Sequence, residues 1–271
     1  MLRLCVLSIA AACGRVNFAN LSDAGVASDA APCTEPWGPA VELVYGYVEP
    51  SVTPDELELY LVRGGELFVM SRVSRTMPWS APQLLPIPPN TDYSDNTPSI
   101  SGDGLTLYFS SYQMGNAFVE VSRRATRDGA WSLPTDSGVF GNPEIRDDEL
   151  EIVIQDYMSP IQRATRASVT DGFSALTPVE AIINDGSTNA SPGLSSDGLE
   201  LYFWSNRTGT PALYVARRSS LTAPFTTVEP LGIERPGAGG LAADVSSDGH
   251  HLYFSMFATG DYATYVSSRC E

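Results

Sequence analysis

The fold of this protein is decided by the stretch Ser99-Ile100-Ser101-Gly102-Asp103-Gly104-Leu105-Thr106-Leu107-Tyr108-Phe109, which recurs along the chain. Two further clear copies span Ser195–Phe203 and Ser246–Phe254, and two degenerate copies begin at Thr53 and Arg146. The shared aspartate falls at positions 55, 103, 148, 197 and 248, so successive copies are 48, 45, 49 and 51 residues apart. A near-even period of this length is typical of repeat architectures.

Each copy predicts two β-strands around a tight turn. Asp-Gly favours a hairpin because glycine adopts positive φ and aspartate hydrogen-bonds the turn backbone. The Leu-x-Leu-Tyr-Phe pattern that follows alternates apolar positions as a strand does. A third β-rich segment comes next and ends at an arginine: Arg72, Arg124, Arg166, Arg218 and Arg269. Seven residues after each of the first four arginines, an aromatic residue opens a predicted fourth strand: Trp79, Trp131, Phe173 and Phe225. Four strands at this period predict an all-β fold, a five-bladed β-propeller with four-stranded blades.

The last blade lacks a fourth strand at the C-terminus, because the chain ends at Glu271. The segment Trp37–Leu43 resembles Trp79–Leu85, so we expect the N-terminal strand to complete the last blade and remove an open sheet edge. In the repeat alignment Cys33 and Cys270 fall in one inter-strand turn, which predicts a disulfide between them. The entropic model assigns such a bridge a stabilisation of roughly 2–5 kcal/mol.

The segment Pro98–Phe109 resembles the repeat of TolB-type, WD-like β-propellers, whose core is Ser-Pro-Asp-Gly followed by an aliphatic and aromatic strand. The resemblance covers about residues 37–271. The third copy departs most, with Arg146 and Glu149 where the family has serine and glycine. The resemblance implies a propeller fold and a role in interaction with other molecules.

Composition limits the classes of partner. The net charge of −16 argues against a nucleic-acid partner, which would favour a basic protein. All sixteen basic residues are arginine. No cofactor and no metal ion are predicted.

The N-terminal residues 1–13 resemble an export signal. A short apolar stretch follows Arg3 and is too short to span a bilayer. Ala10-Ala11-Ala12-Cys13-Gly14 resembles a bacterial lipobox in which Cys13 would be lipidated, and an ordinary signal peptidase site is the alternative. Residues 14–32 are predicted to be a flexible tether and 33–271 the propeller. We therefore expect export to the periplasm or cell surface, with lipid anchoring to the outer membrane, where a disulfide is stable.

The sequence offers no recognised catalytic motif. The two histidines, His250 and His251, are adjacent in a predicted strand and point to opposite faces, so they do not form a two-histidine metal site. The five-fold recurrence of the repeat aspartate identifies Asp103, Asp197 and Asp248 as turn formers rather than as catalytic groups. The sequence contains no P-loop, no dinucleotide fingerprint and no Gly-x-Ser-x-Gly.

One constellation of polar residues remains. In a propeller the first strand of each blade lines the central channel, and here these strands begin at Glu49, Thr97, Asn142, Ser191 and Ala242. Positions one and three of each strand are expected to share a face. That face would bring Glu49, Glu144 and Asp244 towards one axis, beside Asn142.

Three interpretations of these residues are open. They form a solvated polar channel, a binding site for a cation, sugar or peptide, or a glycosidase-type acid and base pair. The sequence favours a non-enzymatic, envelope-tethered propeller that binds an unknown protein, peptide or glycan and contacts the membrane only through its lipid anchor. The alternative is an extracytoplasmic glycan-active hydrolase that uses the channel carboxylates.

Overall fold

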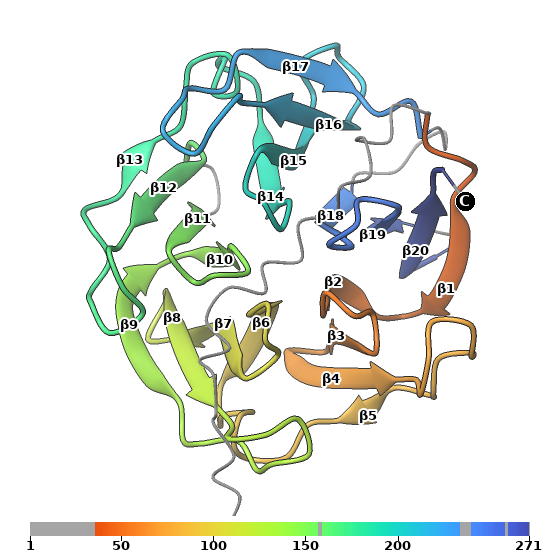
Figure 1. Cartoon of the computed structure of the whole chain (residues 1–271), viewed down its shortest axis with the longest axis vertical. Coiled ribbons are helices and arrows are strands. Elements are labelled where there is room, and N and C mark those ends of the chain that lie inside the picture. Colours follow the sequence, from red (N-terminus) through yellow and green to blue (C-terminus); the bar gives the residue numbers. More distant parts are fainter. Residues whose placement is uncertain (1–35, 157–158, 234–239, 258–259, 271) are drawn as a thin grey trace, which may run out of the picture. The chain divides into compact units, whose positions relative to one another are not determined.

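The computed structural model describes residues 36–156, 159–233, 240–257 and 260–270. Within these ranges the chain forms twenty β-strands in five four-stranded antiparallel sheets. The predicted five-bladed β-propeller is confirmed, and the five sheets surround a common centre (Figure 1).

The blades follow the chain in order. Blade 1 contains β2 (Val48–Val52), β3 (Glu58–Arg63), β4 (Glu66–Ser71) and β5 (Gln83–Leu84). Blade 2 contains β6 (Ser94–Ile100), β7 (Thr106–Gln113), β8 (Asn116–Arg123) and β9 (Thr135–Phe140). Blade 3 contains β10 (Asn142–Ile145), β11 (Glu151–Gln155), β12 (Gln162–Thr165) and β13 (Thr177–Pro178). Blade 4 contains β14 (Asn189–Leu194), β15 (Glu200–Ser205), β16 (Ala212–Arg217) and β17 (Thr227–Pro230). Blade 5 contains β18 (Gly240–Val245), β19 (His251–Phe257), β20 (Tyr262–Ser268) and β1 (Val41–Tyr45).

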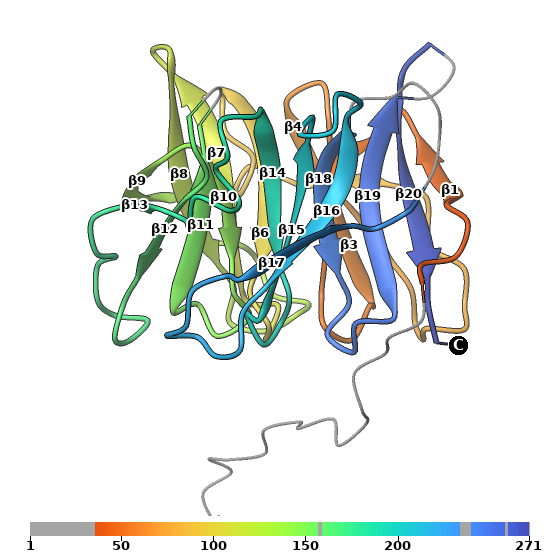
Figure 2. The ribbon, with the colours of Figure 1, turned by 90° about the horizontal axis from the view of Figure 1, so that it is seen from above.

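The first strands β2, β6, β10, β14 and β18 lie innermost, and the fourth strands lie at the rim (Figure 1). The strands run between two faces of the ring (Figure 2). We call the face that carries the Asp-Gly turns the turn face. The opposite face, where the first strands begin, is called the cavity face.

The repeat aspartates form the turns on the turn face. Asp103 Oδ1 accepts hydrogen bonds from the Ser101 hydroxyl at 2.6 Å and from the Leu105 N–H at 2.8 Å. The turns at Asp197 and Asp248 repeat this pair of bonds. Because each carboxylate is used to close its own hairpin, the interpretation of these residues as turn formers is confirmed.

The two degenerate turns have glutamate where the others have glycine. Glu56 and Glu149 adopt positive φ values of 54° and 60°, a conformation that is costly for any residue with a Cβ atom. Their carboxylates cross to the preceding blade, where Glu56 accepts a bond from the Tyr253 hydroxyl and Glu149 one from the Tyr108 hydroxyl, each at 2.7 Å. The strained turns therefore link neighbouring blades.

Five hydrophobic clusters hold the ring together, one at each junction between blades. The apolar residue that ends each first strand lies in a different cluster, as the sequence predicted: Val52, Ile100, Ile145, Leu194 and Val245. The tyrosine of the Leu-x-Leu-Tyr-Phe pattern is also buried in four blades, where Tyr60, Tyr108, Tyr202 and Tyr253 are at most 2% exposed. Burial of this apolar surface is the main stabilising contribution to the ring.

The arginine and aromatic pattern has a structural basis on the turn face. Each arginine guanidinium lies 4.3–4.9 Å from the ring centre of the aromatic residue that follows it in the repeat. Its Nε also donates to a turn carbonyl, for example Arg124 Nε to Gly104 O at 2.9 Å. The predicted fourth strands begin two to four residues later than expected, because the aromatic residue is held under the arginine before the strand starts.

The N-terminal strand closes the ring. β1 pairs with β20 in an antiparallel register, and the Arg269 guanidinium lies 4.3 Å from the centre of the Trp37 ring. The predicted closing strand and the register that places Trp37 are therefore confirmed. Cys13 and Cys33 lie outside the described residues, so lipidation and the Cys33–Cys270 disulfide stay predictions.

Candidate functional site

A cavity of about 200 Å³ opens at the centre of the cavity face. Its walls come from the beginnings of the first strands, with two carboxylates, Glu49 and Glu144, and the amide of Asn142. The residues at position two, counted from Glu49 and its equivalents in the other first strands, also line it: Pro50, Pro98, Pro143, Pro192 and Ala243. The structure thus brings three of the four predicted site residues together, and Asp244 does not line this cavity.

The expectation that positions one and three share one face of each strand holds only in blade 3, where the pairing is regular and Asn142 and Glu144 both line the cavity. The pairing register shifts near these positions in blades 1, 2, 4 and 5. Glu49, Thr97 and Ser191 have positive φ values of 56°, 45° and 53° at these bulges. A bulge interrupts the alternation of side chains, so positions one and two line the cavity while most residues at position three are buried elsewhere.

The third position instead links each blade to the next. Ser51 Oγ accepts the N–H of Ile100 at 3.0 Å, and Ser99 Oγ accepts the N–H of Ile145 at 2.8 Å. In the same way Glu144 Oε1 accepts the N–H of Leu194 at 3.4 Å.

Asp244 completes this ring of inter-blade bonds, because its Oδ2 accepts the N–H of Val52 at 2.7 Å. Gly193 is the exception among the residues at position three, because it has no side chain that could accept a hydrogen bond. A Cβ atom at Gly193 would lie 1.7 Å from the carbonyl oxygen of Ala243, so only glycine permits the approach of blade 5. The N–H of Val245 is bonded instead by Asp244 Oδ1 at 2.8 Å. Asp244 therefore satisfies two buried backbone donors.

Burial makes these carboxylates hard to ionise. It raises the pKa of Asp244 to about 7, with a further contribution from the charge of Asp147, although the N–H of Val52 acts in the opposite direction. Burial, together with the charge of Asp244, raises the pKa of Glu144 well above its usual range. Burial also raises the pKa of Glu49, against the effect of its bond from the Thr97 N–H at 2.7 Å.

Tyr112 is the main site residue that the sequence did not indicate. It lies near the end of β7, lines the cavity and is 44% exposed. Burial of its hydroxyl, and then the charges of Asp156 and Glu49, raise the pKa of Tyr112. The equivalent position is Gly64 in blade 1 and Asn206 in blade 4, but the sequence has an aromatic residue there in blades 3 and 5, Tyr157 and Phe257. An aromatic residue in three of the five copies is the signal that could have identified it.

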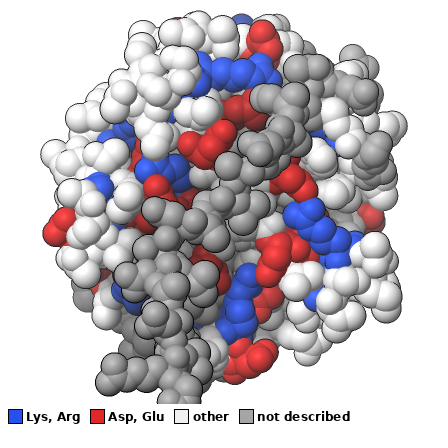
Figure 3. Space-filling view, in the orientation of Figure 1, with Lys and Arg blue, Asp and Glu red and all other residues white. Residues whose placement is uncertain are grey.

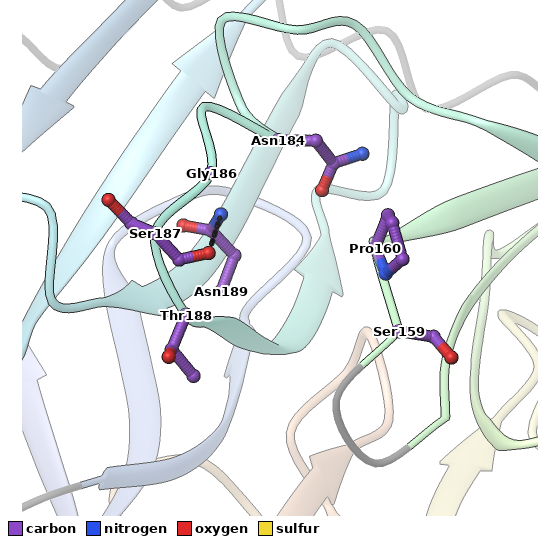
Figure 4. Close-up of a pocket in the computed structure, with 7 residues that line it drawn as sticks. All are labelled: Ser159, Pro160, Asn184, Gly186, Ser187, Thr188 and Asn189. Carbon is purple, nitrogen blue, oxygen red and sulfur yellow. Dashed lines mark hydrogen bonds between the residues drawn. The ribbon is translucent and has the colours of Figure 1, made fainter.

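A second cavity, of about 290 Å³, lies between blades 3 and 4 (Figure 4). Its described walls carry small polar groups and no charged side chain. The Asn184 amide is already bonded to the backbone of Ile161 at 2.9 and 3.0 Å, and Asn189 Nδ2 donates to Ser187 O at 3.1 Å. These polar groups are satisfied within the protein, so this cavity is the weaker candidate for a site.

The turn face carries interleaved arginine and acidic side chains (Figure 3). One group, Glu56, Asp248 and His251, brings its potential metal-ligating atoms within 4.8 Å of one another. Arg75 already pairs with both carboxylates, at 3.1 Å to Glu56 and 2.5 Å to Asp248. The guanidinium supplies the counter-charge that a metal ion would supply, so we interpret this group as a structural link between blades 5 and 1.

Comparison with known proteins supports the fold. No family model and no curated protein matches the chain. The structure of a putative TolB from Agrobacterium tumefaciens is similar, with a TM-score of 0.53 and 19% identity over 79% of this chain and 71% of that one. TolB from Acinetobacter baumannii gives a TM-score of 0.50 and 17% identity over 82% of this chain and 54% of its own. A thermostable family-43 glycoside hydrolase gives a TM-score of 0.56 and 12% identity over 87% of this chain and 92% of its own.

These likenesses define a class of fold. The chain has a five-bladed β-propeller fold that is similar to the propellers of the two TolB structures. It spans about half the length of the Acinetobacter TolB chain. The same architecture is found in a glycoside hydrolase, so function has to be argued from the site. The described part of the chain contains no helical segment with the length and hydrophobicity that a membrane span requires.

Proposed function

We propose that this protein is a non-enzymatic binding propeller of the cell envelope, and that it binds a peptide segment of a protein partner at the cavity face. The observation that carries the proposal is the cavity at the ring centre, which combines prolines, an exposed tyrosine and two carboxylates. A concave site with an apolar lining and a few polar groups is the usual form of a ligand site.

The engagement of the carboxylates supports binding rather than hydrolysis. Glycoside hydrolysis needs an acid and a base that flank the scissile bond and are available to it. Here Glu49 and Glu144 each accept a backbone N–H of the next blade, and Asp244 accepts two. Carboxylates that are held by these hydrogen bonds stabilise the contacts within the ring.

The glycan-active alternative is tested directly. A panel of glycans is incubated with the oxidised protein, and hydrolysis is followed by reducing-end release. Turnover that is lost in both Glu49→Gln and Glu144→Gln would establish the alternative and refute the binding proposal. We expect no turnover above that of the buffer.

The proposed envelope location depends on the predicted lipidation of Cys13. Incorporation of labelled palmitate that is abolished by Cys13→Ser would support the anchor. Incorporation that persists in Cys13→Ser, or that does not occur, would exclude lipidation at this cysteine.

The binding proposal is tested by panning a displayed peptide library on the full chain. We expect selected peptides to lose at least tenfold in affinity for Tyr112→Ala, a change of about 1.4 kcal/mol. The control is Val169→Ala on the turn face, where the side chain is exposed and lies in the turn that follows β12. Peptides that bind both variants as they bind the wild type would refute the cavity face as the binding surface.

A further inference from the structure

Charge is unevenly divided between the two faces. The five repeat arginines and Arg75 and Arg127 lie on the turn face, where carboxylates of the same and neighbouring blades pair with them (Figure 3). The described lining of the central cavity has two carboxylates and no arginine or histidine. Arg63, the last residue of β3, and Arg207, just after β15, lie on the cavity face but do not line the cavity, so its carboxylates have no basic side chain among the described residues that line it.

Glu49 presents an oxygen to the cavity. Its Oε2 accepts the N–H of Thr97 at 2.7 Å, and among the described residues no hydrogen bond or ion pair is formed by its Oε1. The side chain is half-buried, and burial raises its pKa. A cation beside this oxygen would supply the counter-charge that the protein does not.

Tyr112 adds an aromatic surface next to the carboxylates. Its ring lines the same cavity as Glu49, and the charges of Asp156 and Glu49 both act on its hydroxyl. An exposed aromatic ring beside carboxylates is the usual environment for a bound ammonium or guanidinium group, which interacts with the ring face and the charge together.

Aromatic exposure is confined to this face. Among the described residues, five aromatic side chains are strongly exposed: Tyr45, Tyr93, Tyr112, Phe140 and Phe257. Each lies at or near the end of a strand or the beginning of a first strand on the cavity face. The exposed large apolar residues of the turn-face loops are aliphatic, for example Val73 and Leu133. Exposed aromatic residues are enriched at protein interfaces.

We propose that the central cavity takes an arginine or lysine side chain of a peptide segment whose neighbouring apolar residues pack on the aromatic residues of the cavity face. This inference rests on the proposed peptide-binding function and adds the chemistry of the anchoring residue. Charge complementarity specifies the anchor, because the cavity offers carboxylates and an aromatic ring without a basic group of its own.

The test uses two synthetic probes that differ only in charge. The first is acetyl-Leu-Arg-Leu-amide, and the second carries citrulline, the neutral isostere of arginine, at the centre. Binding to the oxidised full chain is measured by isothermal titration calorimetry at low ionic strength. We expect the arginine peptide to bind at least tenfold more tightly than the citrulline peptide. Glu49→Gln should reduce this difference about tenfold, and Tyr112→Leu should weaken the arginine peptide selectively.

The matched control is Asp92→Asn, which removes an exposed carboxylate of the cavity face that does not line the cavity. It should leave the preference for arginine unchanged. Equal affinity for the two probes, no binding of either at millimolar concentration, or an undiminished preference in Glu49→Gln would overturn the cation site.

The peptide-library experiment distinguishes failure of the cation site from failure of the proposed peptide-binding function. Selected peptides that bind the cavity face but lack arginine and lysine would overturn the cation site alone. Selected peptides that ignore Tyr112→Ala would overturn the proposed function as well.

Discussion

The buried carboxylate of Asp244 predicts an unusual dependence of stability on pH. Burial raises the pKa of Asp244 to about 7 in the folded protein, whereas an aspartate in an unfolded chain has a pKa of about 3.9. Between these values the unfolded chain has lost its proton and the folded protein keeps it. The folded state therefore binds more protons, and the free energy of unfolding falls as the pH rises through this window.

The size of the effect follows from the two pKa values. Each unit of pH in the window costs about 1.4 kcal/mol, and the interval from pH 5 to pH 7 lies inside it. Asp244 by itself should make the wild type roughly 2–3 kcal/mol less stable at pH 8 than at pH 5, or lower in Tm by about 5–10 °C. The raised pKa values of Glu49, Glu144 and Asp147 act in the same direction and add to this loss. Asp55, Glu56, Asp148 and Asp248 have lowered pKa values, so their contributions are lost only below about pH 4.

The variant Asp244→Asn tests this reasoning. Asparagine offers one acceptor oxygen for two backbone N–H groups, so the variant should be about 1–3 kcal/mol less stable than the wild type at pH 5. It carries no charge, so the part of the loss between pH 5 and pH 8 that comes from Asp244 should disappear, while the part that comes from Glu49 and Glu144 remains. Urea unfolding followed by tryptophan fluorescence at both pH values measures the difference, with Asp92→Asn as the control. A variant that keeps the wild-type pH slope would refute the assignment of the effect to Asp244.

Three further predictions concern the closure of the ring. Gly193→Ala places a Cβ atom against the backbone of blade 5 and should cost about 3 kcal/mol or more in urea unfolding, whereas Gly172→Ala, which meets open space, should change little. Trp37→Leu removes the ring under Arg269 and should lower stability by roughly 2–4 kcal/mol, and a loss no greater than that of an exposed Leu133→Ala would count against the closing register. Cys270→Ser should lower the Tm of the oxidised protein to that of the reduced wild type. An oxidised protein with a reactive thiol at Cys270, shown by alkylation and mass spectrometry, would exclude the predicted disulfide.

The repeat made most of the fold predictable. Asp103-Gly104 and its copies carry their own turn chemistry, and the apolar alternation after them forms a strand in any context that buries one face. The arginine and aromatic pair recurs at a fixed spacing in the first four blades, and the likeness of Trp37–Leu43 to Trp79–Leu85 located Trp37 in the last blade. Because these patterns are local, the spacing of residues along the chain was sufficient to predict the strands and turns.

The site was predictable only in part. Glu49, Asn142 and Glu144 were placed correctly at the channel because the first strands were assigned correctly. Asp244 was grouped with them by simple alternation, but a bulge changes which side chains face the cavity. Tyr112 was missed because it lies beyond the repeated part of its strand.

The sequence by itself determined the number of blades, their strand order, the turn aspartates and the N-terminal closing strand, since each depends on residues close together or on a repeated spacing. The tertiary structure alone decided what the inner carboxylates do. Whether Asp244 lines the cavity or bonds to Val52, 192 residues away, depends on the bulge in β18 and on how blade 5 packs against blade 1. That packing is formed by a hydrophobic cluster built from both blades, and no spacing along the chain encodes it.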